Sequence, residues 1–395
     1  MFNFDKSIKF YAVRWTIKAA LISTAAAVPL VLASPQDASA KVTGKCYNCH
    51  TMHNSQGTNP MVSGGGGPIS SLLINSCVGC HSSAGSSTTY VLGDSTVPVV
   101  NYIGSGEPTE YLAGGNFYWV KEGNTNAADS KGHNVFLDED DDTLTLAPGA
   151  NVLGCGTDSC HENLSQPCYD SSFFPYVDDG DYGCKGCHLN ERHHADDDSA
   201  GGVVTTVEQG FYRFLAGHRD VTSGKGAQGY EDPNWEAGQP NLSIGGANHN
   251  EYLGSSTANS YGFDGGDGGN GTTAFCTGCH GNFHSTDPNQ TGATWLRHPS
   301  DAVIPASGEY DDVGGAGHLY DPLSPVAKQS IDATPDTTVT VGSDMVMCLS
   351  CHRPHATPYP DLLRWDYAGN MIAGNTSAGD NYTGCFYCHT LKDDG

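Results

Sequence analysis

Fourteen of the fifteen cysteines in this 395-residue sequence occur in pairs, and each pair is followed directly by a histidine. Six pairs have the spacing Cys-x-x-Cys-His: Cys46/Cys49-His50, Cys77/Cys80-His81, Cys184/Cys187-His188, Cys276/Cys279-His280, Cys348/Cys351-His352 and Cys385/Cys388-His389. At this spacing two thioethers can fix the vinyl groups of one porphyrin, which holds the histidine under the iron as its proximal ligand. A single Cys-x-x-Cys is usually a redox dithiol, but six that all continue into histidine predict c-type haem attachment.

The seventh pair, Cys155 and Cys160 before His161, has four intervening residues instead of two. A longer loop can still bring both sulfurs to the vinyl groups, so we expect a seventh haem here. The alternative is a disulfide involving Cys168, the one cysteine outside the motifs, and the count would then be six. If the seventh haem is present, Cys168 is a free thiol or an intermolecular crosslink.

Histidines outside the motifs can supply the second axial ligand of each iron. The candidates are His53, His133, His193, His194, His218, His249, His284, His298 and His355, and His318 is a further histidine outside the motifs. Methionine is the alternative ligand, but the whole chain contains only six methionines. We therefore expect low-spin bis-His iron throughout, with lower potentials than Met/His ligation gives.

Three of these histidines lie just beyond a haem motif, namely His53, His284 and His355. Each is too close in sequence to reach the far face of its own haem. We expect such a residue to ligate a neighbouring iron, which would hold two haems in contact. His193 and His194 follow the His188 motif in the same way, although only one of them need be a ligand.

The composition indicates that the protein does not build its core from aliphatic side chains. Hydrophobic residues make up 37% of the chain, glycine reaches 51 and the mean hydropathy is −0.37, yet there are 19 Tyr and 13 Phe. Little aliphatic material is available to offset the ordering entropy. We therefore expect a multihaem cytochrome c fold, mostly coil with short helices and a few short strands (residues 203–207, for example), wrapped round a stacked haem chain.

The N-terminus predicts export. Four basic residues between positions 6 and 18 precede an apolar run at 19–32, and Ala38-Ser39-Ala40 supplies a small-x-small cleavage site. This pattern is typical of a secretory signal peptide at 1–40, which leaves one heptahaem domain at 41–395. A retained membrane anchor is the alternative, but the run is short for a spanning helix, and we expect no transmembrane segment in the mature chain. The formal charge of −26 argues against nucleic-acid binding.

The segment Cys46-Tyr-Asn-Cys-His-Thr-Met-His-Asn-Ser-Gln56 resembles the N-terminus of the outer-surface multihaem cytochromes of metal-reducing bacteria, the OmcS-like filament-forming group. Further similar blocks are residues 132–134, 193–196, 249–252, 275–284, 295–299 and 348–355. The resemblance implies head-to-tail polymerisation into extracellular filaments with haems stacked through every subunit. It also implies that His53 ligates a haem of the adjacent subunit. The chain departs from the group's known members in its haem count, which reads as seven.

The expected function is electron transfer in an extracellular or outer-surface filament, with other cytochromes and metal oxides or electrodes as partners. The first alternative is a discrete shuttle in the periplasm or at the cell surface, which does not polymerise. The second is a multihaem reductase of oxyanions, which needs an iron with an open position, often marked by a replaced proximal ligand. Every motif here ends in histidine, so we expect an electron carrier and no enzyme.

Overall fold

The computed structural model describes residues 42–53, 55–56, 59–60, 72–109, 112, 114–136, 148, 183–188, 193–194, 202–205, 214–215, 227–232, 244–254, 271–276, 280, 298–371 and 384–390. The chain divides into two units, Met1–Ser39 and Ala40–Gly395, and every described residue belongs to the second. Over these ranges no helix is both long and apolar enough to cross a bilayer.

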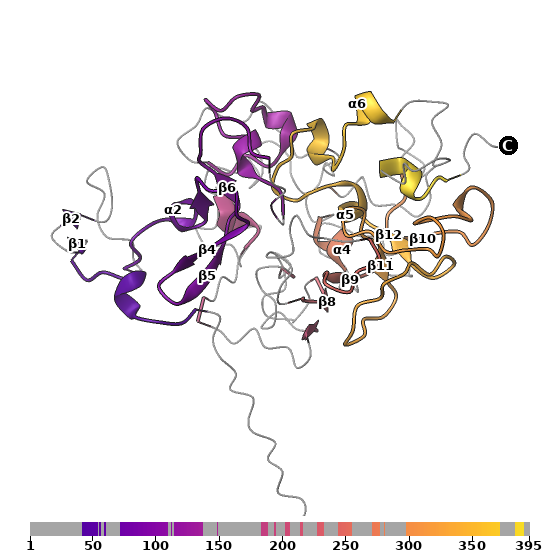
Figure 1. Ribbon diagram of the computed structural model, residues 1–395, viewed down its shortest axis with the longest axis horizontal. Helices are drawn as coiled ribbons and strands as arrows, with labels where there is room; N and C mark the ends of the chain where they lie inside the picture. Colours follow the sequence, from indigo (N-terminus) through magenta and orange to yellow (C-terminus); the bar gives the residue numbers. More distant parts are fainter. Residues whose placement is uncertain are drawn as a thin grey trace, which may run out of the picture. The chain divides into compact units, whose positions relative to one another are not determined.

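Regular elements are short, and coil connects them (Figure 1). The α-helices are α2 (Cys77–Cys80), α4 (Thr272–Cys276), α5 (Cys348–Cys351) and α6 (Tyr367–Asn370). The 3₁₀ helices are η1 (Cys46–Asn48), η3 (Phe117–Trp119), η4 (Asp129–Lys131), η5 (Gly183–Gly186), η9 (Gly308–Tyr310), η10 (Pro360–Leu362) and η11 (Gly384–Tyr387). The predicted architecture of coil with short helices and strands is thereby confirmed, and a helical turn includes the first cysteine of each described motif.

The strands have two to four residues each. They are β1 (Ser55–Gln56), β2 (Asn59–Pro60), β3 (Ser82–Ser83), β4 (Thr89–Leu92), β5 (Ser95–Pro98), β6 (Asn101–Tyr102), β7 (Val203–Val204), β8 (Gly229–Tyr230), β9 (Glu251–Leu253), β10 (Ala302–Val303), β11 (Ala327–Lys328) and β12 (Met345–Val346). The expected strand at 203–207 is present at its first two residues.

Six of these strands form one sheet in the order β10-β12-β11-β9-β8-β7, and the others pair as β1-β2, β3-β6 and β4-β5. Within the large sheet β9 and β11 are parallel, and the neighbouring pairs are antiparallel. Parallel neighbours need a long crossover connection. The connection between β9 and β11 contains α4, which contacts α5. The cysteine motif that begins at Cys276 therefore lies beside the motif that begins at Cys348.

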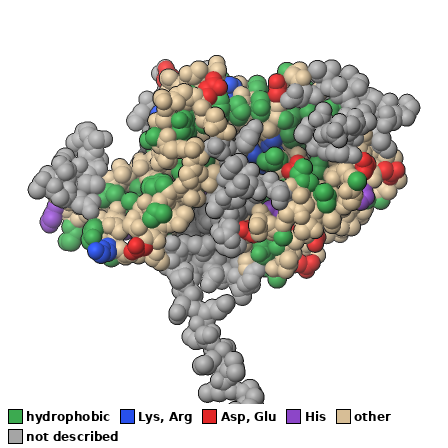
Figure 2. Space-filling model, viewed as in Figure 1, with side chains coloured by type: hydrophobic (Ala, Val, Ile, Leu, Met, Phe, Trp, Pro, Cys, Tyr) green, Lys and Arg blue, Asp and Glu red, His purple; other side chains and the backbone are tan. Residues whose placement is uncertain are grey.

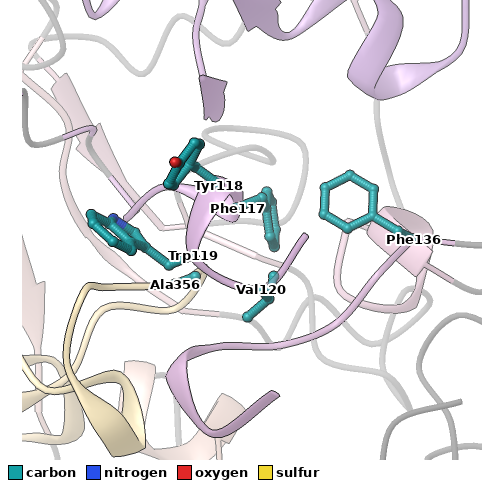
Figure 3. Close-up of a cluster of buried hydrophobic side chains, with 6 residues drawn as sticks. All are labelled: Phe117, Tyr118, Trp119, Val120, Phe136 and Ala356. Carbon is teal, nitrogen blue, oxygen red and sulfur yellow. The ribbon is translucent and has the colours of Figure 1, made fainter. Parts of the chain in front are cut away.

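Apolar side chains of the described residues gather in four small clusters. Figure 3 shows one of them, in which Phe117 and Phe136 from different segments meet edge to face with ring centres 5.9 Å apart. Asn116 starts η3 in this cluster, because its side-chain oxygen accepts a hydrogen bond of 3.0 Å from the Tyr118 N–H. Clusters of this size agree with a chain whose own side chains do not form one continuous core.

A buried polar group lies on the large sheet. Lys328 on β11 places Nζ 2.6 Å from a carboxylate oxygen of Asp344 and 3.0 Å from one of Asp336. Burial lowers the pKa of Lys328, but the two carboxylates more than offset this effect and leave the pKa raised. Lys328 is therefore charged in the folded protein, and Asp344, itself buried, is its principal counter-ion.

The surface agrees with the acidic composition. On the face shown in Figure 2, Lys and Arg side chains of the described residues are scattered and do not form a continuous basic patch.

Candidate functional site: paired histidines at the cysteine motifs

Each described motif forms a single helical turn. The histidine N–H donates to the carbonyl of the first cysteine four residues earlier, with N···O distances of 2.8 Å (His50), 2.7 Å (His81), 2.9 Å (His188), 3.0 Å (His280), 3.0 Å (His352) and 2.9 Å (His389). Residues four apart lie on one face of such a turn. The turn therefore directs the imidazole and the first sulfur to the same side, as attachment of one porphyrin requires.

Five proximal histidines face a second histidine from another part of the chain. The pairs, with their ring-centre distances, are His50–His194 (6.1 Å), His81–His193 (6.3 Å), His188–His355 (6.3 Å), His280–His133 (6.1 Å) and His389–His298 (6.1 Å). The planes vary from 20° apart in the first pair to 88° in the last. The distance between ring centres is therefore nearly the same in all five pairs, whereas the angle between the ring planes differs widely.

This separation fits one metal ion held between two imidazoles. A bond from a metal ion to an imidazole nitrogen is about 2 Å long. The ring centre lies ~1 Å beyond that nitrogen, so two rings on opposite sides of one ion have centres roughly 6 Å apart. Ring stacking alone would not reproduce this value at interplanar angles from 20° to 88°. The residues present therefore fit a haem iron with two axial histidines.

In several of these histidines, and in His352, the Nδ1 atom lies within hydrogen-bonding distance of a backbone carbonyl. Nδ1 lies 2.9 Å from the Pro98 carbonyl in His81, 2.7 Å from Pro148 O in His280, and 2.7 Å from Asp361 O in His352. His133 and His298 make the same contact, at 2.7 Å to Pro354 O and 2.8 Å to Pro299 O. A carbonyl only accepts hydrogen bonds, so Nδ1 carries the proton and Nε2 keeps a free lone pair for iron.

The protonation equilibria favour the same state. Burial lowers the pKa of His133, His280 and His352, and lowers that of His355 to about 3. A metal-binding imidazole must be neutral. These rings are therefore neutral at physiological pH without any metal.

Consecutive histidines serve two different motifs. The sequence required only one ligand from His193 and His194, but His193 faces His81 and His194 faces His50. His355 faces His188, and does not face His352 of its own motif. Each of these contacts joins two motifs.

Other candidates are placed differently. His53 is exposed, and no described histidine ring faces it. His249 stacks on Tyr320 with ring centres 4.0 Å apart, and its Nε2 lies 4.0 Å from a carboxylate oxygen of Glu251. His318 directs Nδ1 at the Val313 carbonyl, 3.0 Å away. The remaining candidates lie outside the described residues, namely Cys155, Cys160, His161, Cys168, His218, Cys279 and His284.

The motifs contact one another through their cysteines. Cys184 is hydrogen-bonded to Cys77, and Cys276 to Cys348. Cys351 lies within electrostatic reach of Cys385 and Cys388. The sulfurs that would anchor different haems are therefore neighbours, so the motifs form local groups and not isolated sites.

Two glycines position the histidines that join these groups. Gly132 forms an isolated β-bridge with Ala356, and the His133 N–H donates to the His355 carbonyl at 2.9 Å. A Cβ at Gly132 would overlap Ala356, and Gly115, with φ of +101°, packs against the other side of the same residue. Neither glycine was predicted to position a histidine. The only signal was the glycine directly before His133, which by itself predicts no contact.

Comparisons with known proteins find one matching family and several similar proteins. A family described as "Doubled CXXCH motif" matches residues 339–394, which contain the last two cysteine motifs. C-type cytochrome OmcS of Geobacter sulfurreducens is 28% identical over 407 residues, covering 85% of this chain and 84% of that protein.

Two solved structures from the same organism match at 20% identity. The first, "Outer Membrane Cytochrome S Filament", has a TM-score of 0.47 and covers 83% of this chain and 85% of that chain. The second, the OmcS nanowires, has a TM-score of 0.39 and covers 82% and 84%.

The motifs, the family match and the similar cytochrome together support covalently attached haem c at the cysteine pairs. The match to the similar cytochrome extends over most of the chain, well beyond the cysteine pairs. The resemblance to the OmcS-like multihaem c-type cytochromes, expected from the motifs, is thereby confirmed.

Proposed function

We propose that this protein transfers electrons through seven covalently attached c-type haems with bis-His ligation, as a subunit of an extracellular filament that delivers electrons to metal oxides or other acceptors. The observation that carries the proposal is the set of five histidine pairs with ring centres 6.1–6.3 Å apart. Six of the seven sites include described residues, and the seventh is Cys155/Cys160 with His161.

Paired histidines determine what kind of chemistry is available. When bound, haem iron supplies one-electron oxidation and reduction. Both imidazoles of a pair would bind the iron of a haem held there, and no position would then remain for a substrate. The rings also stay neutral, which keeps the ligand set unchanged in both oxidation states. These properties support an electron carrier over a reductase.

The contacts between motifs support a continuous path. The Cys46, Cys77 and Cys184 motifs form one group through Cys77–Cys184 and the adjacent ligands His193 and His194. The later motifs form a second group through Cys276–Cys348. His355, three residues after His352, faces His188 and so links the second group to the first. Electrons can then pass between neighbouring sites along the whole subunit.

Two described histidines that no described histidine ring faces support self-association. His53 is exposed beside two other exposed side chains, Met52 (77% exposed) and Tyr47 (53% exposed). His352 is the described proximal histidine that no described histidine ring faces. We assign the haem at Cys348/Cys351 as the site that takes His53 from the next subunit. Such a bond would hold neighbouring subunits together, because His53 of one subunit would be an axial ligand in the next.

The protein is exported in this proposal. Residues 1–40 are a cleaved signal peptide, and residues 41–395 form the mature heptahaem domain at the outer surface or in the medium. Other cytochromes supply the electrons.

The test is electron cryo-microscopy of the native haem-loaded protein together with the variant His53→Ala. The wild type should form filaments with seven haems per subunit, and intact mass should give the same count. The variant should retain every haem, show one high-spin iron and fail to assemble. Added imidazole should restore its low-spin spectrum but not its filaments. Met52→Ala is the matched control, which should assemble. Discrete wild-type particles would favour the shuttle, and filaments of the variant with an unchanged spectrum would exclude the role of His53.

A further inference from the structure

Glu309 lies beside the last proximal histidine of the chain. Its carboxylate oxygen Oε1 is 3.2 Å from Nδ1 of His389. That nitrogen is buried from solvent and makes no aligned hydrogen bond among the described residues, so the contact with Glu309 is a close approach of two charged or polar groups. A buried imidazole N–H left without an acceptor is costly, because it has lost its bond to water. Glu309 is the acceptor within reach.

The position of Glu309 is fixed by the haem motif itself. Thr390, the residue after His389, donates both its backbone N–H (2.8 Å) and its hydroxyl (2.9 Å) to the Glu309 carbonyl. Thr390 is fully buried. The 3₁₀ helix η9 is thereby attached to the end of the motif, which fixes the backbone from which the Glu309 side chain reaches His389.

A neighbouring tyrosine holds the carboxylate from the other side. Tyr310 packs its ring 5.2 Å from the His389 ring and hydrogen-bonds to the Glu309 carboxylate. A carboxylate only accepts hydrogen bonds, so the Tyr310 hydroxyl is the donor in this contact. The Tyr310 ring also packs against Tyr387 and Val313 in a buried cluster.

Other proximal histidines have a different partner. Nδ1 of His81, His280 and His352 faces a neutral backbone carbonyl. An anionic acceptor withdraws the Nδ1 proton further, which makes Nε2 a stronger electron donor to iron. A stronger donor stabilises the oxidised, more positively charged iron over the reduced one. Second-sphere hydrogen bonding of this kind is a recognised means of setting haem potential.

We propose that Glu309 is a potential-setting residue, which accepts the Nδ1 proton of His389 in a hydrogen bond and lowers the potential of the haem at Cys385/Cys388 below that of sites with a carbonyl partner. The proposal rests on the bis-His ligation proposed above. Each reduction at this site adds one electron from a neighbouring haem, and the proton stays on His389 Nδ1 in both oxidation states. The C-terminal site is then the least readily reduced of these four.

The His298–His389 pair provides a site-specific readout. Its planes lie at 88°, whereas those of His50–His194 lie at 20°. Perpendicular imidazoles leave the iron d orbitals closer in energy than parallel ones do, so the oxidised haem gives a separate low-spin EPR signal. The intensity of this signal, followed during titration with dithionite and ferricyanide, reports the midpoint potential of one haem among several.

Three variants of the full-length holoprotein test the role. Glu309→Gln removes the charge and Glu309→Asp keeps the charge but withdraws it from Nδ1. Asp311→Asn, an exposed neighbour on the same segment, removes an equal charge without touching His389.

We expect both Glu309 variants to shift the midpoint potential of the Cys385/Cys388 haem upward, with the other haems and the haem count unchanged. Asp311→Asn should match the wild type. An unshifted midpoint in Glu309→Gln, or an equal shift in Asp311→Asn, would overturn the proposal. Absence of the perpendicular signal from the wild type would instead overturn the His298–His389 ligation, and the role of Glu309 with it.

Discussion

His188 and His355 lie with ring centres 6.3 Å apart, although His355 follows a different cysteine motif. The ring of His355 also stacks on Phe117, with centres 4.5 Å apart and planes at 26°. Phe117 belongs to the buried cluster of Figure 3, so the position of His355, a proposed axial ligand, depends on the packing of an aromatic core.

Phe117→Ala should therefore affect both stability and ligation. Removing a buried phenyl ring costs about 3–5 kcal/mol, because a cavity replaces it. The loosened His355 should give a fraction of high-spin iron at the Cys184/Cys187 site, visible in the absorption spectrum well below the melting temperature. Val91→Ala, at a side chain that is 69% exposed, is the control and should stay within about 0.5 kcal/mol of the wild type. A fully low-spin Phe117→Ala protein would show that the ring does not hold His355.

Removal of His194 should open one iron. His194→Ala takes away the ring that faces His50, so the haem at Cys46/Cys49 should become five-coordinate and bind carbon monoxide when reduced. His318→Ala is the matched control, because no described proximal histidine faces His318, and its spectrum should not change. Absorption and EPR spectra distinguish the two outcomes. A low-spin His194→Ala spectrum would mean that His50 has another partner.

The buried ion pair predicts unequal effects of two similar substitutions. Asp344→Asn leaves the Lys328 charge buried without its principal partner, which should cost about 3–5 kcal/mol. Asp336→Asn removes a carboxylate whose side chain is 55% exposed, and should cost less than about 1 kcal/mol. Thermal unfolding of the oxidised protein measures both. Equal losses would indicate that the two carboxylates share the charge.

His249 and Glu251 predict opposite pH dependences. Burial lowers the pKa of His249 to about 4 from 6.5, so stability from this residue is present above pH 6.5 and is lost as pH falls toward 4. Burial raises the pKa of Glu251 to about 7 from 4.5, so stability from this residue is present below pH 4.5 and is lost as pH rises toward 7. Between these limits the two effects oppose each other.

Glu251→Gln should leave only the histidine effect, and stability relative to the wild type should rise with pH between 4.5 and 6.5. His249→Asn should give the opposite trend. Each slope should approach roughly 1.4 kcal/mol per pH unit, and melting temperatures taken across this range measure it. Slopes of the same sign in both variants would contradict the assignment.

The cysteine motifs were predictable because their chemistry is local: one helical turn aligns His50 with Cys46 whatever the rest of the chain does. The histidine pairs were not, because His133 and His280 come from segments with no shared periodicity. Two-residue strands such as β8 and β11 carry too little alternation to predict a sheet. Glu309 gave no signal either, because its partner His389 lies far away in the sequence.

The neighbouring residues His193 and His194 face the histidines of two different motifs and are joined by one peptide bond. Consecutive Cα atoms are held about 3.8 Å apart by covalent geometry. Thermal motion of the surrounding coil cannot stretch that link, so in the proposed haem-loaded protein it would limit how far the irons at the first two motifs can move apart. Insertion of a single residue between them would do more damage there than a long insertion in any surface loop.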